Sequence, residues 1–415
     1  MTAALQTACC IVGGGPAGMM LGFLLARAGV DVTVLEKHKD FNRDFRGDTI
    51  HPATLEVLHE LGLLEAFLQV PHQKIEGLSL LIGGRQLSLV DLTHLPTTAK
   101  YIALMPQWDF LNFLADEARK FPAFHLLMEH NVTDLVHEGG RVVGARANTP
   151  NGPAEVRAPL TVGCDGRHAT TTGAAHFSVI EQGVPIDVLW FRVSRRSTDP
   201  ENALGYFNFG TASGLIDRGD YWQIAFLIPK GKLAEFQAQG LDNFRARLSR
   251  LVPFLAEANA EGQSRVDEIT SFDQLKLLTV KIDHLQRWYA QGILCIGDAA
   301  HAMSPVGGIG INIAIQDAVA AANILSGPLQ LATMDRPVPT GTLAEVQKSR
   351  ATAVRITQTF QAIAHRGLIR ALNSSGVMHP SFLLRTISSW PAARRFMGRV
   401  IGMGVKPEHV HSRKA

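Results

Sequence analysis

The chain is poor in cysteine, and its cysteines show no pattern typical of cross-links or metal sites. Four occur in 415 residues: Cys9, Cys10, Cys164 and Cys295. Each stands in an apolar, strand-like run, and none has the spacing of metal ligands. We therefore expect small buried thiols in a reducing compartment, with no disulfide framework and no metal site.

Long apolar runs and one-sided charge are also missing. No uninterrupted apolar stretch reaches the ~18–20 residues that span a bilayer, so we expect no transmembrane segment. The N-terminus lacks the basic region of a signal peptide, which favours a cytoplasmic location. The 40 Lys and Arg nearly balance the 37 Asp and Glu. Because basic residues are scattered, except in the tail Lys406–Ala415, nucleic-acid binding is not expected.

Glycine is abundant near the N-terminus, where it forms a nucleotide-binding pattern. Gly13, Gly15 and Gly18 make G-x-G-x-x-G directly after the expected strand Ala8–Val12. The first glycine permits a tight turn, the second lets the backbone approach a pyrophosphate, and the third lets a helix pack on the strand. A helix beginning near Pro16 and Ala17 would direct its N-terminal amides at the phosphates. The candidate cofactor residues of this turn are Gly13, Gly15, Pro16, Ala17 and Gly18.

An acid completes this pattern. Glu36, with Lys37 beside it, ends the next expected strand, Asp31–Leu35. A carboxylate there can accept hydrogen bonds from an adenosine ribose and disfavours a 2′-phosphate. The pattern therefore predicts FAD or NAD, rather than NADP, as the tightly held ligand.

A second segment with a strand, a glycine, an acid and a helix distinguishes between these two ligands. The apolar strand Ile293–Ile296 leads to Gly297 and Asp298, and after three more glycines to a helix expected over Ile311–Leu325. An NAD dehydrogenase needs only the first site, whereas a flavin extends away from its ADP half and needs a partner element. We therefore expect non-covalent FAD, with Asp298 on the ribityl hydroxyls. The amides of Gly310, Ile311 and Asn312 would then face the pyrimidine edge of the flavin.

A third motif is Asp165–Gly166 in "LTVGCDGRHATTTGAA", directly after the strand Leu160–Gly163. With these three motifs in order, the chain resembles the group A flavoprotein monooxygenases, the para-hydroxybenzoate hydroxylase family. The Gly297–Asp298 motif continues as in the family, through Pro305, Gly307, Gly308, Gly310 and Asn312. The chain departs from the family where a serine and an arginine usually follow the Asp-Gly motif, because Ala169 and Thr172 stand there. Asp165 therefore has two open roles, in cofactor binding or in holding the local backbone.

The resemblance also implies roles for three further residues. Arg46 matches a family arginine that contacts the flavin, with Arg43 as the weaker alternative. Gln107 matches a glutamine near the ribityl chain. Pro305 stands beside the expected flavin ring, where its backbone carbonyl would shape the cavity. His301 receives no catalytic role, and no residue is assigned as a general base.

The order of helix and strand patterns predicts an α/β fold with an α+β insertion. We expect a Rossmann-like FAD-binding domain of residues 1–72, 98–176 and 282–345. A sheet-based substrate domain, 73–97 and 177–281, would interrupt it, and helices and a tail would follow over 346–415. Three local predictions are a hairpin at 77–92, a helix at Asn243–Leu251 and a loop at 327–346.

The resemblance implies an FAD-dependent monooxygenase that uses NADH or NADPH as a transient co-substrate. A flavin 4a-hydroperoxide formed with O2 would hydroxylate an aromatic, phenolic or quinone-like small molecule. Two alternatives stay open: a flavin oxidoreductase or dehydrogenase without oxygen insertion, and a non-catalytic FAD-holding protein. A flavin halogenase shares the fold, but the sequence has no W-x-W-x-I-P motif. The protein is expected to be a monomer or a homodimer.

Overall fold

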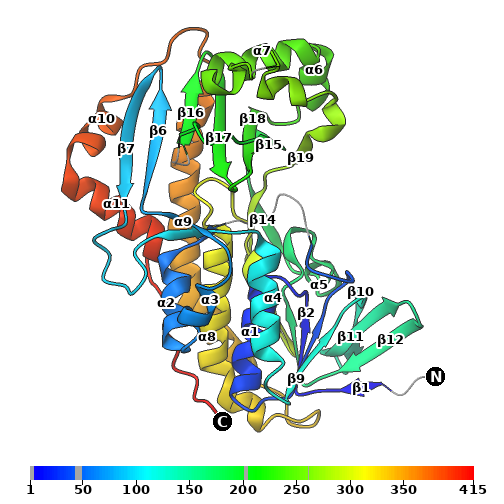
Figure 1. Ribbon diagram of the computed structural model, residues 1–415. Helices are drawn as coiled ribbons and strands as arrows, with labels where there is room; N and C mark the ends of the chain where they lie inside the picture. The colour runs from blue at the N-terminus through cyan, green and yellow to red at the C-terminus, as the bar shows by residue number, and fades with distance from the viewer. Residues whose placement is uncertain (1–3, 43–48, 201–203, 260) are drawn as a thin grey trace.

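The fold is mixed α/β, as the sequence predicts. The computed structural model describes residues 4–42, 49–200, 204–259 and 261–415. In this part of the chain, the strands form a six-stranded sheet and a seven-stranded sheet, with three smaller sheets beside them. Figure 1 shows the seven-stranded sheet above a bundle of long helices, with the six-stranded sheet beside those helices.

The six-stranded sheet is assembled from distant parts of the chain. Its order is β21 (Tyr289–Ala290), β22 (Ile293–Cys295), β13 (Leu160–Gly163), β2 (Cys9–Val12), β3 (Val32–Leu35) and β9 (Phe124–Leu127). All neighbours pair in parallel except β21 with β22. Central parallel strands are covered on both faces, which explains why β2 and β13 are apolar or buried at every position.

Alternate residues of β2 enter two different cores. Cys9 and Ile11 pack in the cluster shared with the helices α1 (Pro16–Arg27), α4 (Gln107–Ala118) and α8 (Gly310–Gln330). Cys10 and Val12 pack in a second cluster with a four-stranded sheet on the other face. That sheet has the order β1 (Leu5–Gln6), β12 (Gly152–Arg157), β11 (Arg141–Thr149) and β10 (Asn131–Glu138). Strand β12 was not predicted.

The seven-stranded sheet joins the two segments predicted to form the substrate domain. Its order is β19 (Lys276–Leu278), β15 (Ile186–Ser194), β18 (Tyr221–Pro229), β17 (Thr211–Asp217), β16 (Leu204–Asn208), β6 (Gly77–Ile82) and β7 (Arg85–Asp91). The predicted hairpin is β6–β7, and its β6 pairs in parallel with β16. Helix α7 (Leu241–Leu251) buries Phe244, Leu248 and Leu251 against one face, as its periodicity predicts.

From Gly310 onward the regular elements of the chain are helices. The predicted loop at 327–346 is too long, because α8 continues past Pro328 to Gln330 and α9 (Thr340–Leu372) begins early. Pro328 lies inside α8, in its last turn, where it removes one i→i−4 hydrogen bond without ending the helix. Helix α9 rises from α8 to the seven-stranded sheet, and α10 (Phe382–Ser389) and α11 (Pro391–Met403) lie along β7 (Figure 1).

Shorter elements connect these layers. Two small sheets have the orders β4 (Thr49–Ile50), β8 (Ile102–Leu104), β5 (Gln73–Ile75), and β14 (Val179–Gln182), β20 (Ile282–Leu285). The remaining α-helices are α2 (Pro52–Glu60), α3 (Leu64–Phe67), α5 (Thr170–Ala174) and α6 (Leu233–Ala238). The 3-10 helices are η1 (Gly166–His168), η2 (Pro253–Ala256), η3 (Arg265–Glu268), η4 (Phe272–Gln274) and η5 (Gly297–Ala299).

Candidate active site

The three sequence motifs meet at one edge of the six-stranded sheet. Strands β2, β13 and β22 are neighbours, and the register aligns Val12 with Gly163 and Gly163 with Cys295. Because these strands are parallel, the residues that follow them lie at the same carboxyl edge. In open α/β sheets this edge is where ligands bind.

The glycines after β2 have three distinct environments. Gly13 has a φ of +104°, and a Cβ there would lie 2.5 Å from the Cys164 carbonyl oxygen. At Gly18 a Cβ would overlap the Gly13 carbonyl oxygen, so only glycine lets α1 start this close to the strand. At Gly15 no described atom lies within 4 Å of the Cβ position. The turn is therefore packed against the protein at Gly13 and Gly18, and it has open space for a ligand at Gly15.

Glu36 lies beside this turn and is buried. Its Oε2 accepts a hydrogen bond from the Gly14 amide at 2.9 Å, and its Oε1 accepts one from the His38 amide at 3.1 Å. The carboxylate thus ties the end of β3 to the glycine turn. This contact places an acid next to the open space at Gly15, where a ribose would follow a pyrophosphate.

Asp165 has partners within its own segment. Its Oδ1 accepts from the Thr171 hydroxyl at 2.6 Å, and its Oδ2 accepts from the Thr171 amide at 3.0 Å. Burial is the main cause of a raised pKa for this carboxyl, although the bonds from Thr171 act in the opposite direction. These contacts support the second of the two open roles, in which Asp165 holds the backbone of α5.

Asp298 pairs with an arginine that the sequence analysis did not single out. The Arg167 Nε donates to Asp298 Oδ2 at 3.1 Å, and its Nη2 donates to the Met303 carbonyl at 3.3 Å. The Asp298 side chain keeps 30% of its surface exposed, so one side of the carboxylate remains open to a ligand. Arg167 directly follows Asp165–Gly166, and that position was the available signal.

The two long helices that begin at this edge have uncapped N-termini. Neither α1 nor α8 has a side chain that caps its first turn, and neither has an acidic residue there. The first-turn amides of an α-helix lack intrahelical acceptors and carry partial positive charge. These two N-termini fit an anionic pyrophosphate and the electron-rich edge of a flavin. The residues present therefore fit FAD.

The side chain of Asn312 holds the start of α8 in place. Its Oδ1 accepts from the His51 amide at 2.9 Å and from the Thr54 hydroxyl at 2.7 Å. This leaves the backbone amides of Gly310–Asn312, rather than the Asn312 side chain, for a ligand. Ile311 is buried beside it.

The turn before α8 is packed on one side only. Gly308 has a φ of +62°, and its carbonyl accepts from the Thr49 hydroxyl at 2.8 Å. The Pro305 carbonyl accepts from the Gly308 amide at 3.0 Å, so it stabilises the turn itself. At Gly310 the nearest described atom to a Cβ position is the Met303 Cβ at 3.8 Å. Gly308 is therefore needed by the fold, while Gly310 leaves space.

A buried network of polar side chains, centred on Asp317 of α8, binds the backbone of Gly297. Asp317 Oδ2 accepts from the Gly297 amide at 3.1 Å and lies 2.5 Å from His301 Nε2, while Oδ1 accepts from Arg350 Nε at 3.0 Å. Burial acts to raise the pKa of Asp317, but its interactions with His301 and Arg350 outweigh burial, so the pKa is lowered overall. The His301 ring lies 5.0 Å from that of Trp288. These contacts hold the His301 side chain between Asp317 and Trp288.

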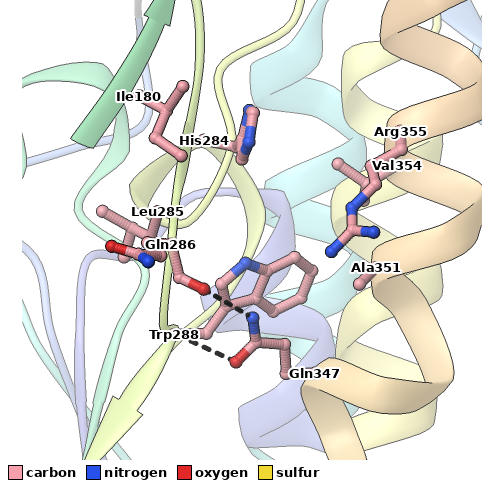
Figure 2. Close-up of a pocket in the computed structure, with 9 residues that line it drawn as sticks. All are labelled: Ile180, His284, Leu285, Gln286, Trp288, Gln347, Ala351, Val354 and Arg355. Atoms are coloured by element: carbon pink, nitrogen blue, oxygen red, sulfur yellow. Dashed lines mark hydrogen bonds between the residues drawn. The ribbon is translucent and has the colours of Figure 1, made fainter. Parts of the chain in front are cut away.

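Trp288 also forms part of a small pocket beside α9. Figure 2 shows the Gln347 side chain bridging two backbone groups there, the Trp288 amide and the Gln286 carbonyl. The cavity has a volume of about 130 Å³ and includes His284 and Arg355. No residue of the three motifs lines it.

The remaining predicted residues have simpler positions. Lys37 is exposed after β3, and Gln107 is the partly exposed first residue of α4. Pro16 and Ala17 open α1. Arg46, like Arg43, falls outside the residues that the structure describes.

The geometry agrees with comparisons to known proteins. A family model described as an FAD binding domain matches residues 6–335. The chain belongs to this family. It is 30% identical over 408 residues to 6-methylpretetramide 4-monooxygenase of Streptomyces rimosus, covering 95% of this chain and 92% of that protein. It is 28% identical over 339 residues to rifampicin monooxygenase of Rhodococcus hoagii, covering 74% of this flavoprotein and 61% of that one.

Solved structures agree on the fold. The p-nitrophenol 4-monooxygenase of Pseudomonas putida superposes with a TM-score of 0.72 at 21% identity, covering 96% of this flavoprotein and 95% of that chain. The resemblance to flavoprotein monooxygenases is confirmed, and the protein is an FAD-dependent oxidoreductase of that class. Across the described residues, no helix is long and apolar enough to cross a membrane. The same residues contain no group of three or more side chains suited to hold a metal ion.

Proposed function

We propose that this flavoprotein hydroxylates an aromatic or quinone-like small molecule, with NADH or NADPH and O2 as co-substrates. The observation that carries the proposal is the meeting of the glycine turn, Asp298 and the start of α8 at one sheet edge. The relatives named as monooxygenases support the same reaction class.

Each element of the site has a proposed role toward FAD. The α1 N-terminus and Gly15 would hold the pyrophosphate, and Glu36 would accept from the ribose. Asp298 would bind the ribityl hydroxyls, oriented by Arg167. The first-turn amides of α8 would stabilise negative charge on the pyrimidine edge. When bound, FAD supplies the redox chemistry, accepting a hydride from the nicotinamide and activating O2.

The seven-stranded sheet offers a surface for a flat substrate. One register row runs through Trp190, Ala225, Gly214, Gly205 and Leu80, on the face opposite the α7 core. At its centre, Ala225 and Gly214 carry little side-chain volume, whereas the Leu80 and Phe207 side chains approach the Cβ position of Gly205. The Trp190 indole N–H is buried and has no partner among the described residues. A ring placed on this row could accept that hydrogen bond while the sheet shields it from water.

Oxygen-isotope labelling tests the reaction class. The purified holoprotein should oxidise NADH or NADPH faster with an aromatic substrate, and one atom from labelled O2 should appear in the product. A product without label would favour the dehydrogenase alternative. Absence of any stimulated NAD(P)H oxidation would favour a non-catalytic FAD-holding protein.

A substitution at Gly214, in this register row of the seven-stranded sheet, tests the proposed substrate surface independently of the reaction class. At Gly214 only the Ala225 Cβ, at 3.9 Å, approaches the Cβ position, so Gly214→Val should fold and retain FAD. We expect the KM for a flat substrate to rise about tenfold or more, as one lost contact of ~1.4 kcal/mol would produce. Gln86→Val on the exposed part of β7 is the control and should leave the KM unchanged.

The cellular location is also a proposal. The four cysteines are free and buried, which suits a reducing compartment. NADH and NADPH are supplied there too. We propose that the protein works in the cytoplasm.

A further inference from the structure

The outer face of the two C-terminal helices is unusually apolar for a surface. Phe382 is 77% exposed, Leu383 66%, Trp390 61% and Phe396 65%. These four side chains lie within fifteen residues of one another on α10, α11 and the junction between them. Contiguous exposed apolar groups of this kind mark interaction sites more often than isolated ones do.

The opposite face of α11 is packed against the protein, and α10 also contacts β7. A Cβ at Gly398 would overlap the Asp91 carbonyl oxygen, so α11 lies directly against β7. Ile401 and Met403 are buried in a cluster with Val90 from that strand. The helices are therefore fixed to the protein by one side, and the exposed aromatic side chains belong to the other side.

Positive charge surrounds these aromatic side chains. Arg385, Arg395 and Arg399 are exposed on the same two helices. The sequence contains no Asp or Glu from Val346 to Pro407. The one ion pair of Arg395 among the described residues is a long contact with Asp91, at 3.9 Å. The outer face of α10 and α11 thus combines Phe, Leu and Trp with three arginines, of which only Arg395 has an acidic partner among the described residues.

This composition selects between possible partners. Helices that lie in the plane of a bilayer surface carry Trp, Phe and Leu for the acyl boundary and Arg or Lys for anionic headgroups. A second copy of the chain would bring the same arginines toward each other in a two-fold contact, which is unfavourable. Charge complementarity therefore favours an anionic lipid surface over self-association.

We propose that the outer face of α10 and α11 docks on the surface of a bilayer containing anionic phospholipid. Phe382, Leu383, Trp390 and Phe396 enter the headgroup region, while the arginines pair with phosphate groups. The protein remains peripheral, because the contact uses one face of two short helices. This surface is separate from the flavin motifs, so the proposal does not depend on the proposed reaction.

Vesicle sedimentation with the full-length holoprotein tests the docking. We expect binding to phosphatidylcholine vesicles that contain phosphatidylglycerol, weak binding to phosphatidylcholine alone, and release by high salt. Both the double variant Trp390→Ser with Phe396→Ser and the double variant Arg395→Glu with Arg399→Glu should lower the partition coefficient roughly tenfold or more. Leu331→Ser, another exposed apolar residue, and Lys276→Glu are controls that should bind like the parent.

A spectroscopic readout reports on the position of Trp390 itself. Tryptophan emission should shift to shorter wavelength on vesicles that contain phosphatidylglycerol, and Trp390→Phe should abolish the shift while retaining vesicle binding. Flavin absorbance and the melting temperature show that each variant is folded. Equal sedimentation of parent and double variants, or no sedimentation of the parent, would overturn the proposal. So would a dimer of the parent that the Trp390→Ser and Phe396→Ser changes convert to monomer, because the occupant would then be a second copy.

Discussion

At the scale of the residue, the glycines of the site divide into two groups. Gly13, Gly18 and Gly308 are required by the protein itself, through a positive φ or through backbone contacts that leave no room for a Cβ. Gly15 and Gly310 have neither constraint, since their Cβ positions face open space. Glycine without a structural reason at a predicted ligand site indicates that the ligand needs the room.

Gly310→Val tests this distinction. The apoprotein should fold with nearly the parent's stability, because no backbone strain opposes the change, but FAD affinity should fall by tenfold or more. Fluorescence titration of apoprotein with FAD, together with urea unfolding, separates the two effects. Gly367→Val, at an open site within α9, is the control and should alter neither quantity strongly. An unchanged FAD affinity for Gly310→Val would show that the start of α8 does not contact the flavin.

Glu36→Ala should weaken FAD binding through two losses. The ribose loses a charged acceptor, and the Gly14 and His38 amides lose the carboxylate that ties them together. Hydrogen bonds to a charged group contribute ~1.5–3 kcal/mol, so we expect the Kd to rise about ten- to a hundredfold. Glu65→Ala, an exposed acid on α3, should bind FAD like the parent. Equal affinities for the two variants would contradict the role of Glu36.

The sequence analysis did not identify the residues that support the motif residues by hydrogen bonds. The glycine turn, Glu36 and Asp298 follow from local patterns, because each motif contains its own strand, turn and acid. Arg167 had only its position after Asp165–Gly166 as a signal, since its partner Asp298 is brought near by sheet order. Asp317 carries no local pattern, because the packing of α8 against the turn and α9 creates its contacts. The roles of the motif residues toward FAD remain predictions.

At the scale of the element, Asp317 joins α8, α9 and the turn that carries Asp298. Asp317→Asn should lower the free energy of unfolding by about 3 kcal/mol, because a buried guanidinium and imidazole lose their charged partner. FAD affinity should fall as well, because the Gly297 amide depends on the same carboxylate. Urea unfolding and FAD titration measure the two effects.

Two comparisons make the test of Asp317 specific. Arg350→Met removes a partner that does not touch the turn, so it should lower stability with a smaller loss of FAD affinity. Asp242→Asn breaks an ion pair on the exposed surface of α7 and should change stability by less than ~1 kcal/mol. A similar small effect for Asp317→Asn would show that the buried network contributes little.

Elements with a clear apolar periodicity or turn signal were the ones that the sequence predicted. Helix α7 and the β6–β7 hairpin were predictable from an apolar stripe and from a Gly-Gly turn. Strand β12 was missed because Gly152 and Pro153 open it and because its partners lie on β11 and β1. The loop at 327–346 was overestimated because α8 continues through Pro328, a residue that ordinarily ends a helix.

At the scale of the whole molecule, His51 links the start of α2 to α11 and predicts a pH-dependent stability. Its Nδ1 lies 2.8 Å from the Ile401 carbonyl oxygen, and burial lowers its pKa to about 4. The unfolded chain binds a proton near pH ~6.5, so the folded state loses stability as the pH falls below that value. From about pH 7 to about pH 5 the loss should be about 2 kcal/mol.

Urea unfolding of the parent and of His51→Gln across this pH range measures the contribution. The variant starts less stable at neutral pH, because the contact with α11 is altered, but its stability should decline less steeply with acid. Parallel curves for the two proteins would show that His51 does not titrate on unfolding.

The order of strands in the six-stranded sheet has a consequence for synthesis on the ribosome. Strand β13 borders β2 on one side and β22 on the other, yet β22 is translated only after the entire seven-stranded sheet. Until then the nascent chain carries an open edge on β13, where wrong pairing and chaperone binding compete with folding. The amides of α8 emerge later still. A polypeptide released before α8 would lack the helix start at which we propose that the flavin binds, so on this proposal incorporation of the cofactor reports that translation has passed this helix.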